Sequence, residues 1–166
     1  MPQTLLAERS TPRPARRHAV ASDTPFENLA VNLRVLRRLV AEQLAEDELA
    51  VTDFWALTGV GDGVTSPTAL GRLLAVSPAG MTQLLDRLEG RGLIGRAPSP
   101  DDRRATVLAL TAKGRDLQRR AGTRCTRFLD AVASELSPDG LVGLQVLSRE
   151  LGVILARRRA AHPPPE

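Results

Sequence analysis

The side chains most often used for catalysis and metal binding are scarce in this chain of 166 residues. It has one cysteine, Cys125, and two histidines, His18 and His162, which lie near its two ends. A lone cysteine forms neither an intrachain disulfide nor a cysteine-based zinc site. A histidine base, a Cys-His pair and a Ser-His-Asp triad all need a histidine in the folded core, and no carboxylate pair stands at a telling spacing. We therefore predict a protein that is not an enzyme and that holds no metal or cofactor.

Arginine supplies nearly all of the positive charge. Lys113 is the only lysine among 23 basic residues, which face 19 acidic ones and leave a net charge of +4. The run from Lys113 to Arg127 holds six cations and a single acid, Asp116. Because arginine suits bidentate contacts with phosphate and guanine, one interpretation is an acidic partner, nucleic acid first. The other is an arginine-preferring genome and a helix with a solvated basic face.

The hydrophobic pattern indicates one globular domain. Apolar residues make up 42% of the chain, the mean hydropathy is −0.14, and no apolar run approaches the ~20 residues of a bilayer span. Without an apolar leader at the N-terminus either, we expect a soluble, cytoplasmic protein. Residues 1–24 predict a flexible Arg/Pro-rich arm, and residues 159–166, which include three prolines, predict a frayed tail.

Four helix starts are predicted where Ser or Thr precedes Pro, because the hydroxyl can cap the helix and proline needs no amide partner in the first turn. They are Thr24-Pro25, Ser66-Pro67, Ser77-Pro78 and Ser137-Pro138. After the first of them, apolar residues at gaps of four, three, four and four reach Leu44, which is the spacing of one helix face. A further helix is expected from Thr52 through Val60.

Two of these helices form a helix-turn-helix candidate, since PAGMTQLLDRLEGRG follows within about three residues of PTALGRLLA. On the second helix one face must be buried, and the opposite face is free to meet a partner. The buried face is Met81, Leu84, Leu85 and Leu88, and the free face is Ala79, Thr82, Gln83, Asp86 and Gly90, with Arg87 at its edge.

Strand-like runs follow this helix. LIGRAP and TVLAL flank a turn rich in Pro, Asp and Arg, and predict a hairpin with Arg103 and Arg104 at its tip. A basic hairpin after a helix-turn-helix is the arrangement called a wing. An ordinary exposed hairpin is the alternative, because charged tips are normal.

Two long helices are predicted to close the chain. One begins near Thr111 and the other after Ser137-Pro138, each carries a regular apolar stripe, and the short turn between them favours an antiparallel pair. With the first helix they offer more apolar surface than the central module can cover. We therefore assign residues 25–48 and 111–158 to a dimerisation region around a central module, residues 49–110.

The stretch from about Thr52 to Gly114 resembles the MarR family of bacterial winged-helix transcription regulators. The resemblance is carried by LGRLLAVSPAGMTQLLDRLEGRGLIGRAPSPDDRRATVLALTAKG, with its Asp-x-Arg motif at Asp102 to Arg104 and its Leu-Thr-x-x-Gly entry to the next helix. With the terminal helices it covers roughly residues 25–158. It implies a mainly α fold with a small β hairpin, a winged helix-turn-helix whose terminal helices form a dimerisation domain. It also implies a sequence-specific regulator, a repressor, that acts as a homodimer on a pseudo-palindromic operator in double-stranded DNA.

The resemblance implies that the second helix of the motif reads base edges in the major groove. Gln83 is the best candidate reader, because its amide can bond bidentately to adenine, and Thr82 offers a hydroxyl or a methyl group. Arg87 is assigned to phosphate, with a surface salt bridge to Asp86 or Glu89 as the alternative. The DNA-binding set on this helix is Ser77, Ala79, Thr82, Gln83 and Arg87.

In the wing, the resemblance assigns Arg104 to the minor groove, whose negative potential attracts an inserted guanidinium. Asp102 would hold that guanidinium through a charge-assisted bond, and Arg103 would contact phosphate or share the tip.

The resemblance further implies a small, often aromatic anion as effector, bound between the DNA-binding lobe and the dimer helices. The candidate ligand-binding residues are Phe54, Trp55, Arg34 and Arg37, with Trp55 as a plain core residue the alternative. Cys125 lies on an apolar stripe, where a buried thiol is a small hydrophobe rather than a redox sensor.

One departure concerns the turn of the motif. The family commonly reads Leu-Ala-x-x-Leu-Gly-Val-Ser, whereas Gly71 and Ala75 stand here at the Ala and Gly places. Glycine within a helix costs about 0.5 to 1 kcal/mol, and alanine is unfavourable in a left-handed turn, so a looser turn is expected. This turn, and the lack of long polar readers before Gln83, support a second interpretation, a winged-helix interaction module without specific DNA binding.

Overall fold

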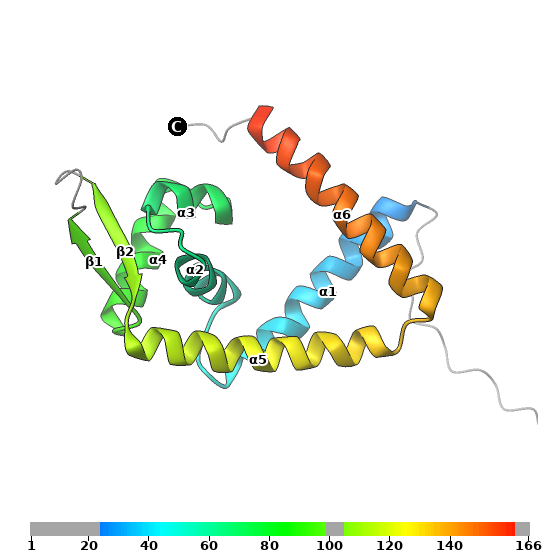
Figure 1. The fold of residues 1–166 in the computed structure, drawn as a ribbon, viewed down its shortest axis with the longest axis horizontal. Helices are drawn as coiled ribbons and strands as arrows, with labels where there is room; N and C mark the ends of the chain where they lie inside the picture. The colour runs from blue at the N-terminus through cyan, green and yellow to red at the C-terminus, as the bar shows by residue number, and fades with distance from the viewer. Residues whose placement is uncertain (1–23, 99–104, 162–166) are drawn as a thin grey trace, which may run out of the picture. The chain divides into compact units, whose positions relative to one another are not determined.

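Six α-helices and one β-hairpin make up the described part of the chain, residues 24–98 and 105–161 of the computed structural model (Figure 1). The expected mainly α fold with a small β hairpin is confirmed. No helix within those residues is long and apolar enough to cross a membrane. In chain order the elements are α1 (Pro25–Ala45), α2 (Val51–Gly61), α3 (Pro67–Leu74), α4 (Pro78–Gly90), β1 (Ile94–Pro98), β2 (Thr106–Leu110), α5 (Ala112–Ser134) and α6 (Pro138–Ala161).

Two compact units divide the chain, and their boundary falls inside α1, between Val35 and Leu36. In the first unit, the described residues form the beginning of α1, where Arg34 Nε donates to the carbonyl oxygen of Ala30 at 3.4 Å. The second unit holds the rest of α1 and every later element. The core, the hairpin and the helix-turn-helix therefore belong to one unit.

Hydroxyl side chains cap the helices at the predicted starts. α1 begins at Pro25, directly after Thr24, and α3, α4 and α6 each begin with the proline that follows a serine. Each capping oxygen accepts a hydrogen bond from a backbone N–H of the first turn. The pairs are Ser66 with Ala69 (3.4 Å), Ser77 with Gly80 (3.2 Å), Ser137 with Gly140 (3.1 Å) and, at the start of α5, Thr111 with Gly114 (2.9 Å).

Leucines from six elements and two loops meet in the core of the second unit. α2 contacts α3, α5 and β2, and α4 contacts α3 and β1. Burying these side chains is the main favourable contribution to the stability of the helix-turn-helix. The largest fully buried ones are Leu44, Leu57, Leu70, Leu88, Leu93 and Leu108.

The hairpin pairs β1 with β2 in antiparallel register, from Ile94 opposite Leu110 to Pro98 opposite Thr106. On its other edge β2 is tied to the loop before α3, because Leu108 N–H donates to the carbonyl oxygen of Thr65 at 2.8 Å. The hairpin is thereby held against the helix-turn-helix. Its tip, residues 99–104, lies outside the described residues.

The start of α5 is locked to the end of α4 around Thr111. Its N–H donates to the carbonyl oxygen of Leu93 at 3.1 Å, and its hydroxyl donates to that of Gly92 at 2.7 Å. Gly114, one turn into α5, packs so closely on this segment that a Cβ atom built on it would lie 1.9 Å from the Leu93 carbonyl oxygen. The Leu-Thr-x-x-Gly pattern thus has a structural cause. The threonine caps α5, and the glycine lets α5 approach the backbone of Leu93.

The antiparallel packing of α6 on α5 that the sequence predicts is wrong for the single chain. Such a pair would bury one stripe on each helix, yet no residue is buried in α6 between Pro138 and Arg158, the part whose side chains are described. The α5 stripe is buried at Leu117, Ala121 and Cys125 but exposed at Val132. The stripe spacing correctly marked apolar helix faces, but it could not tell which surface covers them.

Candidate nucleic-acid interface

The two faces of α4 divide as the periodicity predicts. Met81, Leu84, Leu85 and Leu88 are all buried, with 4% exposure or less. The opposite face is exposed and carries Ala79, Thr82, Gln83, Asp86 and Gly90. The inner face fixes α4 on the core, so the outer face is presented to solvent as a rigid, polar helix surface.

The N-terminal end of α4 is suited to an anionic partner. Pro78 has no N–H, and Ser77 accepts those of Gly80 and Met81, so the N–H of Ala79 is the first-turn amide left to favour phosphate, together with the helix dipole. The hydroxyl of Thr82 donates to the carbonyl oxygen of Pro78 at 3.1 Å. Thr82 is therefore left with an acceptor lone pair and a methyl group to offer, while Gln83 keeps both an amide donor and an acceptor.

The turn before α4 adopts the left-handed conformation expected of it. Ala75 has φ 54° and ψ 43°, a region that costs alanine more than glycine. The turn is closed by Val76 N–H donating to the carbonyl oxygen of Gly71 at 3.0 Å. A Cβ atom at Gly71 would meet Met81 and the Val76 carbonyl only at ordinary contact distances, so the glycine there is not required by packing.

Arg87 is bound to Asp53 of α2 rather than to its neighbours on α4. Its Nη2 lies 2.5 Å from Asp53 Oδ1, and its Nε lies 3.4 Å from Oδ2. The expected alternative partners, Asp86 and Glu89, both pair with Arg96 of β1, at 2.6 and 3.3 Å. α4 is thus tied by ion pairs to α2 on one side and to the hairpin on the other.

The Asp53–Arg87 pair is unevenly buried. The aspartate is 2% exposed, whereas the arginine side chain is 49% exposed. The hydrogen bond to Asp53 raises the pKa of Arg87, burial lowers it by less, and the aspartate's charge raises it further. Sequence reasoning missed Asp53, whose one signal was an acid inside the apolar stretch VTDFWALTGVG. Half of the Arg87 side chain still faces solvent, so its proposed phosphate contact stays a prediction.

The wing residues Asp102, Arg103 and Arg104 lie outside the described residues, and their DNA-binding roles stay predictions. Of the four residues predicted to bind an effector, Phe54 is buried, and its ring centroid lies 5.3 Å from that of Trp55. Trp55 is 50% exposed, so its interpretation as a plain core residue is wrong. Arg37 is exposed in the same unit, whereas Arg34 belongs to the first unit.

The first cations of the basic run bind backbone carbonyls at the start of α5. Lys113 Nζ donates to the carbonyl oxygen of Arg91 at 2.8 Å, and Arg115 Nη1 donates to that of Leu110 at 2.7 Å. Both bonds connect α5 to the segments that precede it. The later arginines of the run, up to Arg127, lie near the loop between α1 and α2.

Cys125 is buried in α5, as its place on the apolar stripe predicts. It is 5% exposed, and burial raises the pKa of its thiol, while the nearby charge of Arg124 lowers it by less. A thiol with a raised pKa carries little thiolate near neutral pH, and only the thiolate is a good nucleophile.

We expect Cys125 in the native protein to react with an aromatic disulfide reagent about a hundredfold more slowly than in the unfolded chain at pH 7. Raising the pH to 8 should speed both reactions and slightly narrow the ratio of their rates, because the unfolded thiol approaches its pKa first. Absorbance of the released thiolate, with and without denaturant, measures both rates. A native rate within about threefold of the unfolded one would contradict the burial of the thiol.

Known DNA-binding regulators resemble this chain in sequence and in fold. A family model described as the MarR family matches residues 62–106. The multiple antibiotic resistance protein MarR of Salmonella typhimurium is 28% identical over 116 residues, which cover 69% of this chain and 81% of that protein.

Solved structures share the fold. The transcriptional repressor CouR, bound to a 23-mer DNA duplex, superposes with a TM-score of 0.71 and 27% identity, over 78% of this chain and 92% of CouR. The PcaV transcriptional regulator of Streptomyces coelicolor, in complex with its natural ligand, gives a TM-score of 0.66 and 23% identity, over 80% and 96% of the two chains. An interaction module without DNA binding gains no support from these relatives.

Proposed function

We propose that the chain is a member of the MarR family and a transcriptional repressor that binds specific double-stranded DNA as a homodimer. The observation that carries the proposal is the division of α4 into a fully buried face and an exposed polar face with a capped N-terminus. A helix held in this way enters the major groove of B-DNA, which is about 12 Å wide and admits one helix.

Base reading falls to the exposed N-terminal half of α4. Gln83 is the direct reader, through a bidentate bond to adenine, and Thr82 contributes an acceptor or a methyl contact. Ser77 and Ala79 bring the backbone close to the duplex, and Arg87 binds phosphate with the half of its side chain that faces solvent. Arg104 occupies the minor groove, with Asp102 and Arg103 in support.

The exposed apolar face of α6 supplies the dimer contact. Its large apolar side chains are 38% to 61% exposed where the structure describes them, and a second copy would bury them. A two-fold dimer places its recognition helices about 34 Å apart, one duplex turn, so the operator is a pseudo-palindrome with half-sites about 10 base pairs apart. The exposed members include Leu141, Leu144, Leu147 and Ile154.

A small aromatic or anionic ligand releases the repressor from DNA. The related PcaV structure contains its natural ligand. A ligand of this kind acts only by preferring a dimer form whose recognition helices are wrongly spaced. Half-exposed Trp55, next to buried Phe54, is the surface we assign to an aromatic ring, and Arg37 of the same unit is the cation we assign to its charge.

The test is a gel-shift titration against the intergenic DNA that flanks the gene, at two salt concentrations and with non-specific competitor. We expect retention that survives competitor, weakens steeply with salt and involves two chains per duplex. Gln83→Ala should lower the preference for the operator over a variant with altered adenines by about 1–3 kcal/mol. Arg104→Ala should weaken binding on all sequences with little change in preference.

Gln118→Ala on α5, the same chemical change outside the recognition helix, is the control and should bind like the parent. Retention that any competitor abolishes equally on every flanking fragment would count against sequence-specific binding there. Equal binding by Arg104→Ala and the parent would refute the assignment of the wing.

A further inference from the structure

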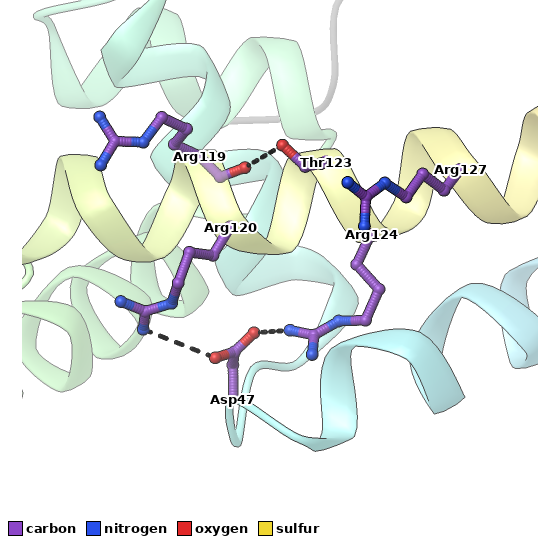
Figure 2. Close-up of a pocket in the computed structure, with 6 residues that line it drawn as sticks. All are labelled: Asp47, Arg119, Arg120, Thr123, Arg124 and Arg127. Atoms are coloured by element: carbon purple, nitrogen blue, oxygen red, sulfur yellow. Dashed lines mark hydrogen bonds and ion pairs between the residues drawn. The ribbon is translucent and has the colours of Figure 1, made fainter.

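A hollow of about 450 Å³ lies between the middle of α5 and the loop that joins α1 to α2 (Figure 2). All of its lining residues belong to the second unit. The volume falls within the range of small-molecule sites, about 300–1,000 Å³. The lining consists of four arginines, one acid and one threonine, namely Arg119, Arg120, Arg124, Arg127, Asp47 and Thr123.

The arginines outnumber the carboxylates that neutralise them. Arg124 and Arg120 both reach the carboxylate of Asp47, Arg120 at 3.7 Å, so one carboxylate serves two guanidiniums (Figure 2). Arg124 also pairs with Glu46. Arg127 has no ion pair among the described residues, and the Nε of Arg124 is buried without a hydrogen-bond partner. Guanidiniums that meet at one carboxylate, as those of Arg120 and Arg124 do, can bind the carboxylate or phosphate groups of a ligand bidentately.

The loop beneath the hollow is also held by the end of the recognition helix. Arg91, the C-cap of α4, donates to the carbonyl oxygen of Glu48 at 2.8 Å and to that of Asp47 at 3.1 Å. The same loop residue therefore connects α5, through its carboxylate, to α4, through its carbonyl. An anion that takes Arg120 and Arg124 away from Asp47 removes one of these two attachments.

We propose that this hollow binds a small anion with two or more negative charges, a polycarboxylate or a phosphate ester, in competition with the carboxylate of Asp47. Arg120, Arg124 and Arg127 are the binding residues, whereas Arg119 of the lining is already paired with Asp116, at 2.8 Å. Binding loosens the loop that holds Arg91 and so weakens DNA binding. This regulatory consequence rests on the proposed function, whereas the anion site itself does not.

The position of the hollow separates it from the surface assigned to DNA. The base-reading residues lie at the N-terminal end of α4, and Arg91 meets the loop beneath the hollow at the C-terminal end. With 13 residues, α4 is about 20 Å long. A small anion, rather than a phosphate of the same duplex, is therefore the occupant that the geometry favours.

Calorimetric titration of the full-length protein with citrate and with pyrophosphate tests the site and distinguishes the two anion classes. Sodium chloride at matched ionic strength is the blank. We expect one anion per chain, binding at least about tenfold weaker in Arg120→Gln/Arg127→Gln, and tighter binding in Asp47→Asn. Arg38→Gln, which removes an exposed arginine from α1, is the matched control and should bind like the parent. Denaturant unfolding checks that each variant is folded.

Anion binding that is unchanged in the double variant, or that chloride reproduces, would overturn the site. Gel shifts with the same anions then separate the two proposals. Failure of the parent to retain any DNA would refute the proposed function but leave the calorimetric result standing. Unchanged retention in the presence of a bound anion would overturn the regulatory role. If Arg127→Gln, which leaves both ion pairs of Asp47 in place, loses DNA affinity without any anion, the hollow is a phosphate contact and the proposal is wrong.

Discussion

Alanine at position 114 is expected to destabilise the protein by about 3 kcal/mol or more. The added Cβ atom would lie 1.9 Å from the carbonyl oxygen and 2.9 Å from the carbonyl carbon of Leu93. Both are backbone atoms, which cannot swing aside as the end of a flexible side chain can. Relief requires the start of α5 to move away from the segment after α4, and that movement breaks the hydrogen bonds of Thr111 to Gly92 and Leu93.

Urea unfolding followed by circular dichroism measures this loss. Gly143→Ala, in the second turn of α6, is the matched control, because a Cβ atom there meets nothing within 4 Å. Since alanine favours the helix over glycine, the control should be stabilised by about 0.5–1 kcal/mol. Equal stability of Gly114→Ala and the parent would show that the close approach of α5 to Leu93 is not required.

The ion pair between Asp53 and Arg87 is expected to respond unequally to removal of its two partners. Arg87→Met leaves the carboxylate of Asp53 buried without a cation, and should cost about 3 kcal/mol, the lower end for a broken buried pair. Asp53→Asn leaves a guanidinium that is 49% exposed and can take up water, and should cost only about 1–2 kcal/mol.

A double-mutant cycle in urea tests this asymmetry. The variant with both changes should lose clearly less than the two single losses together, because the methionine no longer strands a charge. Arg38→Met, which breaks an exposed pair with Glu42 on α1, is the control and should cost about 0.5 kcal/mol or less. Additive losses, or a larger loss for Asp53→Asn than for Arg87→Met, would contradict the described pairing.

Features that depend on a few neighbouring residues were predictable from the sequence. The Ser-Pro pairs gave the starts of α3, α4 and α6, and apolar spacing gave the buried face of α4. The left-handed turn at Ala75 was predicted from a short motif as well. In each case the physical cause, a cap, a helix period or a turn conformation, acts within about one helical turn of chain.

Features that depend on distant residues were not predictable in the same way. Asp53 is 34 positions from Arg87, and Arg124 meets Asp47 across 77 positions. From the sequence, the expected partner of Arg87 was a carboxylate close to it in the chain, such as Asp86. In the structure Asp86 pairs with Arg96 instead. The exposure of α6 likewise depends on which surface packs on it. The spacing of its leucines does not predict that surface.

The chain's only lysine bears on covalent regulation. The ammonium of Lys113 donates to the carbonyl oxygen of Arg91 at the end of the recognition helix. Acylation of lysine amines removes their charge, and arginine does not undergo that reaction. All of the basic side chains assigned to DNA or to the anion hollow are arginines, so lysine acetylation can modify Lys113 alone. A single acetyl group there would reach the recognition helix while leaving the proposed phosphate contacts of the protein intact.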